Sequence, residues 1–149
     1  MTVEDGQGRP ERTRGREAAL QLLYRASVGR LEAEPALAEY WDEAGEYLGS
    51  SADHSVRMFA EGLFNGVRAK EQELDELIMS ALTNWRLERV ALIDKLILRV
   101  AAFELVRGAE PPAVIIDESI ELARRFGGDD SIRFVNGVVD GIRKKLETR

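Results

Sequence analysis

Few side chains in this chain of 149 residues are suited to covalent or metal chemistry. The chain has no cysteine, which excludes a thiolate nucleophile, a disulfide and a zinc–thiolate cluster. Its one histidine, His54, falls in the first turn of an expected helix, where we expect a surface position. A site with two histidine ligands therefore cannot form, and we expect neither a metal nor a cofactor. A hydrolase that uses His54 stays as an alternative.

The acidic residues of interest form two clusters, within residues 117–121 and at residues 129–130. Acid–base catalysis needs two carboxyl groups that face each other across a dry cleft. Glu118 and Glu121 instead lie three residues apart on one helix face, where both would be in water. The pair at residues 129–130 stands where the start of a helix favours a carboxylate. The sequence therefore predicts a protein that is not an enzyme.

The arginines near the beginning of the chain are suited to binding an anion. Overall the chain is acidic, with 21 Lys and Arg against 27 Asp and Glu and a formal net charge of −6. Residues 9–16 nevertheless hold four arginines and one glutamate, and residues 143–149 are also basic. Arg12 and Arg16 share a face of the first helical turn, which is unfavourable for positive charge unless a phosphate is bound there. These segments predict a localised surface for phosphates, with purely solubilising ends as the alternative.

Two aromatic residues stand close to these charged segments. Phe134 lies at the edge of the apolar stripe of the last expected helix, and Tyr24 follows the arginine-rich segment. Either ring could stack on an unpaired base, and core packing is the alternative for both. Gly137 falls inside the same helix as Phe134, where glycine costs about 1 kcal/mol relative to alanine. We interpret it as a place where a ligand or another backbone comes close.

Helices must position these residues, because apolar side chains recur at helical spacing between glycines and prolines. The spacing predicts helices over residues 12–28, 35–49, 56–82, 93–107, 112–126 and 131–146. The third of these is either one long helix or two in line, with Gly66 as a candidate bend. The fourth is apolar on nearly every face, as in a helix surrounded by others. We predict an all-α, single-domain bundle of about seven helices over residues 11–149, after a flexible arm over residues 1–10.

Four segments follow one another in a specific order along the chain. They are RGREAALQLLY (residues 14–24), ILRVAAFEL (residues 97–105), DESIELARRFG (residues 117–127) and SIRFVNGVV (residues 131–139). Together they resemble the NusB family of transcription antitermination factors. The resemblance implies the NusB fold and a non-catalytic protein that binds single-stranded boxA-type RNA together with NusE, a ribosomal protein of the small subunit.

The resemblance also implies which residues form the binding surfaces. Those for RNA are Arg12, Arg14, Arg16, Gln21, Tyr24, Asp130, Phe134 and Asn136. Arginines would neutralise phosphates, the two aromatic rings would stack on bases, and the two amides would bond to base edges. Those for NusE are acidic residues, which suit a basic partner, at Asp94, Glu104 and Glu118. The interpretation requires that folding brings the arginine segment beside Phe134.

The resemblance finally implies a cellular setting, the transcription elongation complex and the synthesis of ribosomal RNA. The sequence has no run of about 18 apolar residues and no secretory leader, so we expect a cytoplasmic protein without a membrane partner. A homodimer that hides the RNA surface stays open. The competing hypothesis is a protein-interaction module that binds no RNA.

Overall fold

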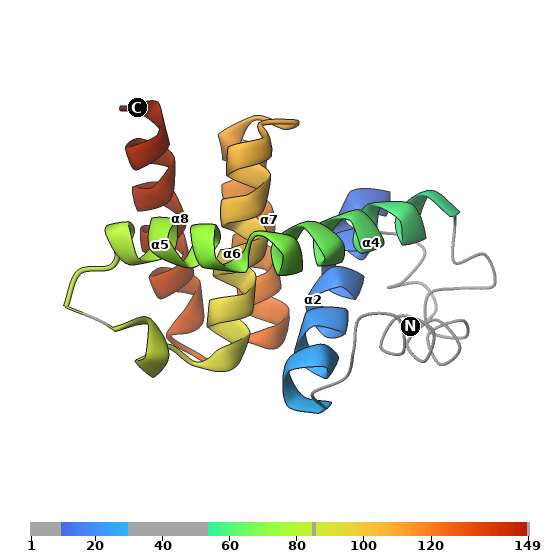
Figure 1. The fold of residues 1–149 in the computed structure, drawn as a ribbon, viewed down its shortest axis with the longest axis horizontal. Coiled ribbons are helices and arrows are strands. Elements are labelled where there is room, and N and C mark those ends of the chain that lie inside the picture. Colours follow the sequence, from blue (N-terminus) through green and yellow to red (C-terminus); the bar gives the residue numbers. More distant parts are fainter. Residues whose placement is uncertain (1–9, 30–53, 85, 149) are drawn as a thin grey trace. The chain divides into compact units, whose positions relative to one another are not determined.

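The structure, a computed structural model, describes residues 10–29, 54–84 and 86–148. In these segments the chain forms six α-helices and one 3-10 helix, and no strand (Figure 1). They are α2 (Glu11–Gly29), α4 (His54–Ala69), α5 (Glu71–Ala81), η1 (Leu87–Arg89), α6 (Leu92–Arg107), α7 (Pro112–Phe126) and α8 (Ser131–Glu147). The predicted all-α fold is confirmed. The helix predicted over residues 35–49 and the arm over residues 1–10, apart from Pro10, lie outside the described residues.

The chain divides into two compact units, residues 1–65 and residues 66–149. The boundary falls inside α4. In the sequence, Gly66 stands at this boundary, and apolar residues recur at helical spacing on both sides of it, as at Leu63, Phe64 and Val67. No helix in the described segments has both the length and the apolar character that crossing a membrane requires.

In the first unit, a glycine allows α2 to lie directly against α4. A Cβ atom at Gly15 would approach the ring of Phe59 to 2.6 Å, so a larger residue would force the ring away. At the start of α4, the hydroxyl of Ser55 donates a hydrogen bond of 3.0 Å to the carboxylate of Glu11. These contacts fix the first turn of α2, which carries the predicted phosphate ligands, against α4.

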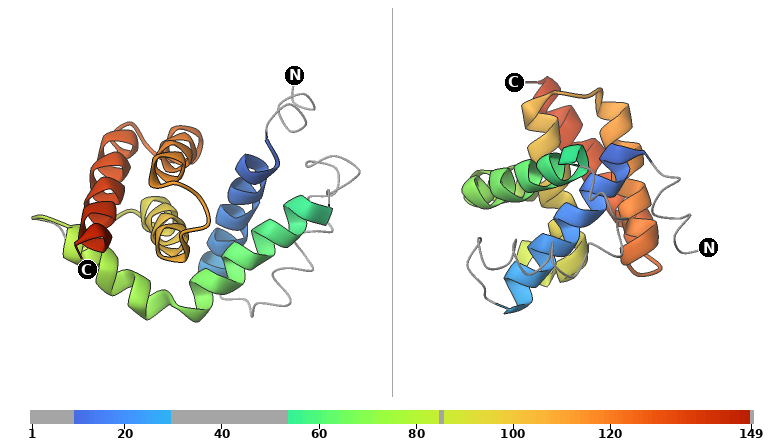
Figure 2. Two further views of the ribbon diagram at one scale, coloured as in Figure 1. Left: turned by 90° about the horizontal axis from the view of Figure 1, so that it is seen from above. Right: turned by 90° about the vertical axis from the view of Figure 1, so that its right-hand side faces the viewer.

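In the second unit, α6 is central because it packs against α5, α7 and α8 (Figures 1 and 2). Its buried side chains point in several directions around the helix axis, among them Leu96, Ile97 and Leu98. The other helices each bury one stripe. That of α8 consists of Val135, Val138, Val139 and Ile142, as the spacing predicted. The prediction that the stretch over residues 93–107 is surrounded by other helices is confirmed.

Arg99 interrupts the apolar surface of α6 and joins this helix to α5. Its guanidinium donates to both carboxylate oxygens of Asp75, at 2.7 and 2.9 Å, and pairs with Glu71 at 2.9 Å. The arginine side chain is only 13% exposed. Two parallel bonds to one carboxylate fix direction as well as distance, so this contact sets how α5 lies on α6.

The helix ends follow local backbone chemistry. Over residues 56–82 there are two helices, and the break between them falls at Lys70 rather than at Gly66. Gly66 is instead needed for packing, because a Cβ atom there would lie 2.2 Å from the ring of Phe103. Gly108 ends α6 in the left-handed conformation, with φ of 69°, and Pro112 occupies the first position of α7.

Candidate nucleic-acid interface

The arginines of α2 lie on two different faces of the helix. An α-helix turns about 100° per residue, so Arg12 and Arg16 lie within about 40° of each other and Arg14 lies far from both. The guanidinium carbons of Arg12 and Arg16 are 4.8 and 5.3 Å from the centre of the Phe59 ring. Both distances are within the range of cation–π attraction. The predicted sharing of one face by Arg12 and Arg16 is confirmed.

Arg16 is the most buried of the three arginines predicted to contact phosphate. Its side chain is 2% exposed, whereas Arg12 is exposed and Arg14 is half-buried. A buried guanidinium against an aromatic ring helps to hold α2 on α4, and its contact with phosphate stays a prediction. The adjacent Glu17 is 3% exposed, and sequence reasoning missed this buried charge. Its position directly before the apolar segment at residues 18–20 is the signal that could have indicated it.

The second face of α2 combines three of the predicted RNA-binding residues. Arg14, Gln21 and Tyr24 follow at intervals of seven and three residues, which places them within about 80° of the helix circumference. Arg14 and Gln21 are half-buried, and Tyr24 is 42% exposed. An exposed ring on the same face as a cation and an amide can stack on a base while the others bond to phosphate and base edge.

The turn before α8 is built by Ser131 rather than by the neighbouring aspartates. The Ser131 hydroxyl accepts a hydrogen bond of 2.9 Å from the backbone N–H of Gly128. Asp130 occupies the N-cap position, but its side chain makes no capping bond and is exposed. Of the two aspartates expected at this helix start, Asp130 therefore occupies the N-cap position, while Ser131 makes the hydrogen bond that holds the turn. The carboxylate of Asp130 remains accessible to a ligand.

The aromatic residue of α8 lies on an open face. Phe134 is half-buried, so the ring is not wholly interior, and it lies about 60° from Gly137 around the helix. A Cβ atom added at Gly137 would meet nothing within 4 Å. Asn136 is also exposed but lies about 160° from Phe134, on the other side of the buried stripe. The structure thus places Asp130, Phe134 and Gly137 on one face of α8 and Asn136 on another.

The basic segment at the end of the chain is largely paired within α8. Arg143 donates to Asp140 at 2.9 Å and pairs with Glu147, and Lys144 lies 3.3 Å from Asp140. The hydrogen bond from Arg143, before all other causes, lowers the pKa of the Asp140 carboxyl below its ordinary value. These ion pairs reduce the positive charge that this segment offers to a phosphate.

The three acidic residues predicted to meet NusE differ in accessibility. Asp94 lies in the first turn of α6, and its Oδ1 atom is buried without a hydrogen-bond partner among the described residues. Glu104 is 3% exposed and lies 3.6 Å from Arg107, which leaves it almost no surface for a partner. Glu118 on α7 is half-buried. Asp94 is thus the acceptor among them that still lacks a donor.

The candidate residues for covalent and metal chemistry can be placed in the described segments. His54 is exposed at the first position of α4, as expected for a surface residue. Across those segments, no three side chains of histidine, cysteine, aspartate or glutamate come close enough together to hold a metal ion. The predicted RNA-binding residues fall into two sets, one on α2 in the first unit and one on α8 in the second. That the two sets adjoin stays a prediction.

Comparison with known proteins matches almost the whole chain. The model of the NusB family covers residues 13–144. A relative from Sorangium cellulosum (strain So ce56), named transcription antitermination protein NusB, is 43% identical over 91% of this chain and 93% of its own length. A protein of the same name from Bacillus subtilis (strain 168) is 37% identical over 92% of this chain and 98% of its own length.

Solved structures of the same fold agree with this match. T. maritima NusB superimposes with a TM-score of 0.79 at 32% identity and covers 92% of both chains. A structure titled as antitermination factors NusB and NusE in complex with dsRNA has a TM-score of 0.79 at 20% identity, covering 91% of this chain and 97% of that one. At that identity the likeness shows the fold. With a family model spanning residues 13–144, this chain belongs to the NusB family.

Proposed function

We propose that this protein is a non-catalytic transcription antitermination factor. It binds single-stranded boxA-type RNA together with the ribosomal protein NusE, within the transcription elongation complex in the cytoplasm, and supports the synthesis of ribosomal RNA. Membership of the NusB family supports this assignment. The structural observation that carries it is the pair of accessible aromatic rings, Tyr24 and Phe134, each on a helix face that also holds polar residues suited to RNA.

The α2 contribution to RNA binding comes from one face of the helix. Arg14 neutralises a phosphate, Tyr24 stacks on a base, and Gln21 bonds to a base edge. Arg12, which is exposed in the first turn, reaches a second phosphate. Arg16 is buried, so its role is to hold α2 against the Phe59 ring and thereby position its neighbours.

The α8 contribution comes from the face of Phe134. The ring stacks on a base, and the open backbone at Gly137 leaves room for that base or its sugar. Asp130, whose side chain is exposed and makes no capping bond, accepts a hydrogen bond from a base rather than contacting phosphate, because a carboxylate repels phosphate. Asn136 lies on a different face of α8. It contacts RNA where the RNA chain crosses the helix from the face of Phe134 to the far side of the buried stripe.

NusE binding is assigned to the acidic residues of α6 and α7. Asp94 is half-buried in the first turn of α6, and its negative charge favours a cationic side chain from a basic partner. Glu118 lies at the edge of this surface. Glu104 is buried, so it influences the partner through Arg107, which lies 3.6 Å away. Asp94→Asn should weaken NusE binding by about 1.5–3 kcal/mol, as loss of a charged hydrogen bond does, and leave RNA binding alone unchanged.

The test is fluorescence anisotropy of the full chain with a labelled single-stranded boxA-like RNA, alone and with NusE, beside a duplex of the same sequence. Phe134→Leu keeps an apolar side chain at the packing position and removes the ring. It should cost about 1–3 kcal/mol of RNA affinity, as should Tyr24→Ala, while the melting temperature changes little. If neither variant changed the affinity for RNA, the proposal would be contradicted. The competing function, a protein-interaction module that binds no RNA, would then be supported.

A further inference from the structure

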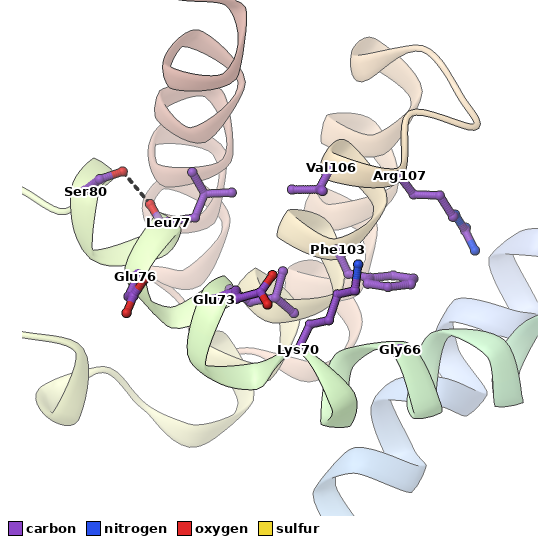
Figure 3. A pocket seen from close by; sticks show the side chains of 10 residues that line it. Gly66, Lys70, Glu73, Glu76, Leu77, Ser80, Phe103, Val106 and Arg107 are labelled. Carbon is purple, nitrogen blue, oxygen red and sulfur yellow. Dashed lines mark hydrogen bonds between the residues drawn. The ribbon is translucent and has the colours of Figure 1, made fainter. Parts of the chain in front are cut away.

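A groove of about 720 Å³ lies between α5 and the C-terminal half of α6, inside the unit of residues 66–149 (Figure 3). Of the residues that line it, Arg107 alone was connected above to a binding surface, through its contact with Glu104. Its volume falls within the range of about 300–1,000 Å³ that binding pockets commonly have. The groove therefore needs an explanation of its own.

The walls of the groove are apolar and preformed. Leu77 of α5 faces Val106 of α6 across it (Figure 3), and Leu74 and Phe103 also line it. The Phe103 ring is held between Gly66, where no Cβ atom would fit, and the guanidinium of Arg107, 5.2 Å from the ring centre. Val106 is 48% exposed, although it is aliphatic and lines the same groove as the buried Leu74 and Leu77. A fixed apolar wall with one exposed valine is suited to receive another apolar surface.

The rim of the groove carries charges in a definite order. Lys70 and Arg107 lie at the end near Gly66, and Glu73 and Glu76 follow along α5 (Figure 3). Within the described residues, Lys70 and the two glutamates take part in no ion pair. With two cations and two carboxylates the rim has no net positive charge, which RNA binding would need, so the arrangement favours a peptide.

The secondary structure of the walls selects the form of that peptide. The described residues of this unit contain no strand, so no sheet edge is available there for an extended segment. A groove between two helices accepts the apolar face of an amphipathic helix. The C-terminal end of a helix is partially negative and its N-terminal end is partially positive, which matches the order of charges on the rim.

We propose that this groove binds an amphipathic α-helix of a partner protein, running antiparallel to α5. Its apolar side chains pack on Leu77 and Val106. Its C-terminal end, with an acidic side chain, meets Lys70 and Arg107, and a basic side chain nearer its N-terminus meets Glu73 and Glu76. This surface adds a second protein partner to the RNA–NusE assembly and does not depend on either ligand.

The test selects a phage-displayed library of short helical peptides on the full chain and measures the selected sequences by anisotropy. The selected peptides should share apolar residues at helical spacing, with a base toward the N-terminus and an acid toward the C-terminus. Val106→Glu should weaken their binding about tenfold or more, as loss of a central interface contact does. Val114→Glu, on an exposed valine of α7 outside the groove, is the matched control and should have no effect.

A charge exchange tests the orientation. Lys70→Glu should weaken the selected peptides and favour versions in which the C-terminal acid is replaced by lysine. The proposal is overturned if no peptide is selected, if Val106→Glu binds as tightly as the unaltered chain, or if the charge order is random. Because Val106→Glu leaves the RNA face untouched, boxA-like RNA binding is measured on the same sample. Its persistence separates a failure of this inference from a failure of the proposed function.

Discussion

Gly137 is the residue at which helix stability and RNA binding should oppose each other. It lies in the middle of α8, on the face of Phe134, with open space where a Cβ atom would be. Gly137→Ala should stabilise the fold by about 0.4–1 kcal/mol, because alanine has less conformational freedom to lose on folding. The same methyl group should weaken binding of boxA-like RNA by about 1 kcal/mol or more if RNA approaches the backbone there.

A second glycine supplies the control for this prediction. Gly62 is exposed within α4, and a Cβ atom there would also meet nothing within 4 Å. Gly62→Ala should give a similar rise in melting temperature and leave RNA affinity unchanged. If both alanine variants bound RNA with equal affinity, Gly137 would not be part of the RNA interface. RNA binding would then not explain why a glycine occupies this position.

At the scale of elements, the contact of Arg99 with Asp75 should determine how firmly α5 holds on α6. Arg99→Lys keeps the charge but cannot donate two parallel bonds to one carboxylate. We expect a loss of about 1–3 kcal/mol in the free energy of unfolding, measured by urea denaturation. Arg124→Lys, at an exposed arginine paired within α7, should change stability by less than about 0.5 kcal/mol. Similar values for the two variants would contradict the structural role of Arg99.

The helices themselves could be predicted from the sequence, because apolar spacing and helix-ending residues are local signals. Gly108 and Pro112 mark their helix ends as expected. The break at Lys70 could not be predicted, since Lys70 is an ordinary helix former and Gly66 is the residue with a weak helix propensity. What keeps Gly66 helical is a tertiary contact with Phe103, which no local pattern reveals.

At the scale of the whole molecule, the sequence predicted which kinds of residue form the candidate site. It did not predict which of them are exposed. The spacing of Arg12 and Arg16 predicted a shared face correctly, yet it did not reveal that this face contacts Phe59 and that Arg16 is buried. The different faces of Phe134 and Asn136, in contrast, follow from their spacing of two residues once α8 is predicted to be a helix. Burial is decided by contacts between helices far apart in the chain, so sequence spacing alone could not separate ligand-binding from structural arginines.

The measurement that tests the central claim most directly is a salt titration of binding to single-stranded boxA-like RNA. The log–log slope changes by about 0.7 for each phosphate contact with a single strand. Replacing Arg12 and Arg14 together by alanine should flatten the slope by about 1.4, while Arg124→Ala should leave it unchanged. A slope that stays the same in the double variant would contradict the account, because the first turn of α2 would then not contact RNA phosphates.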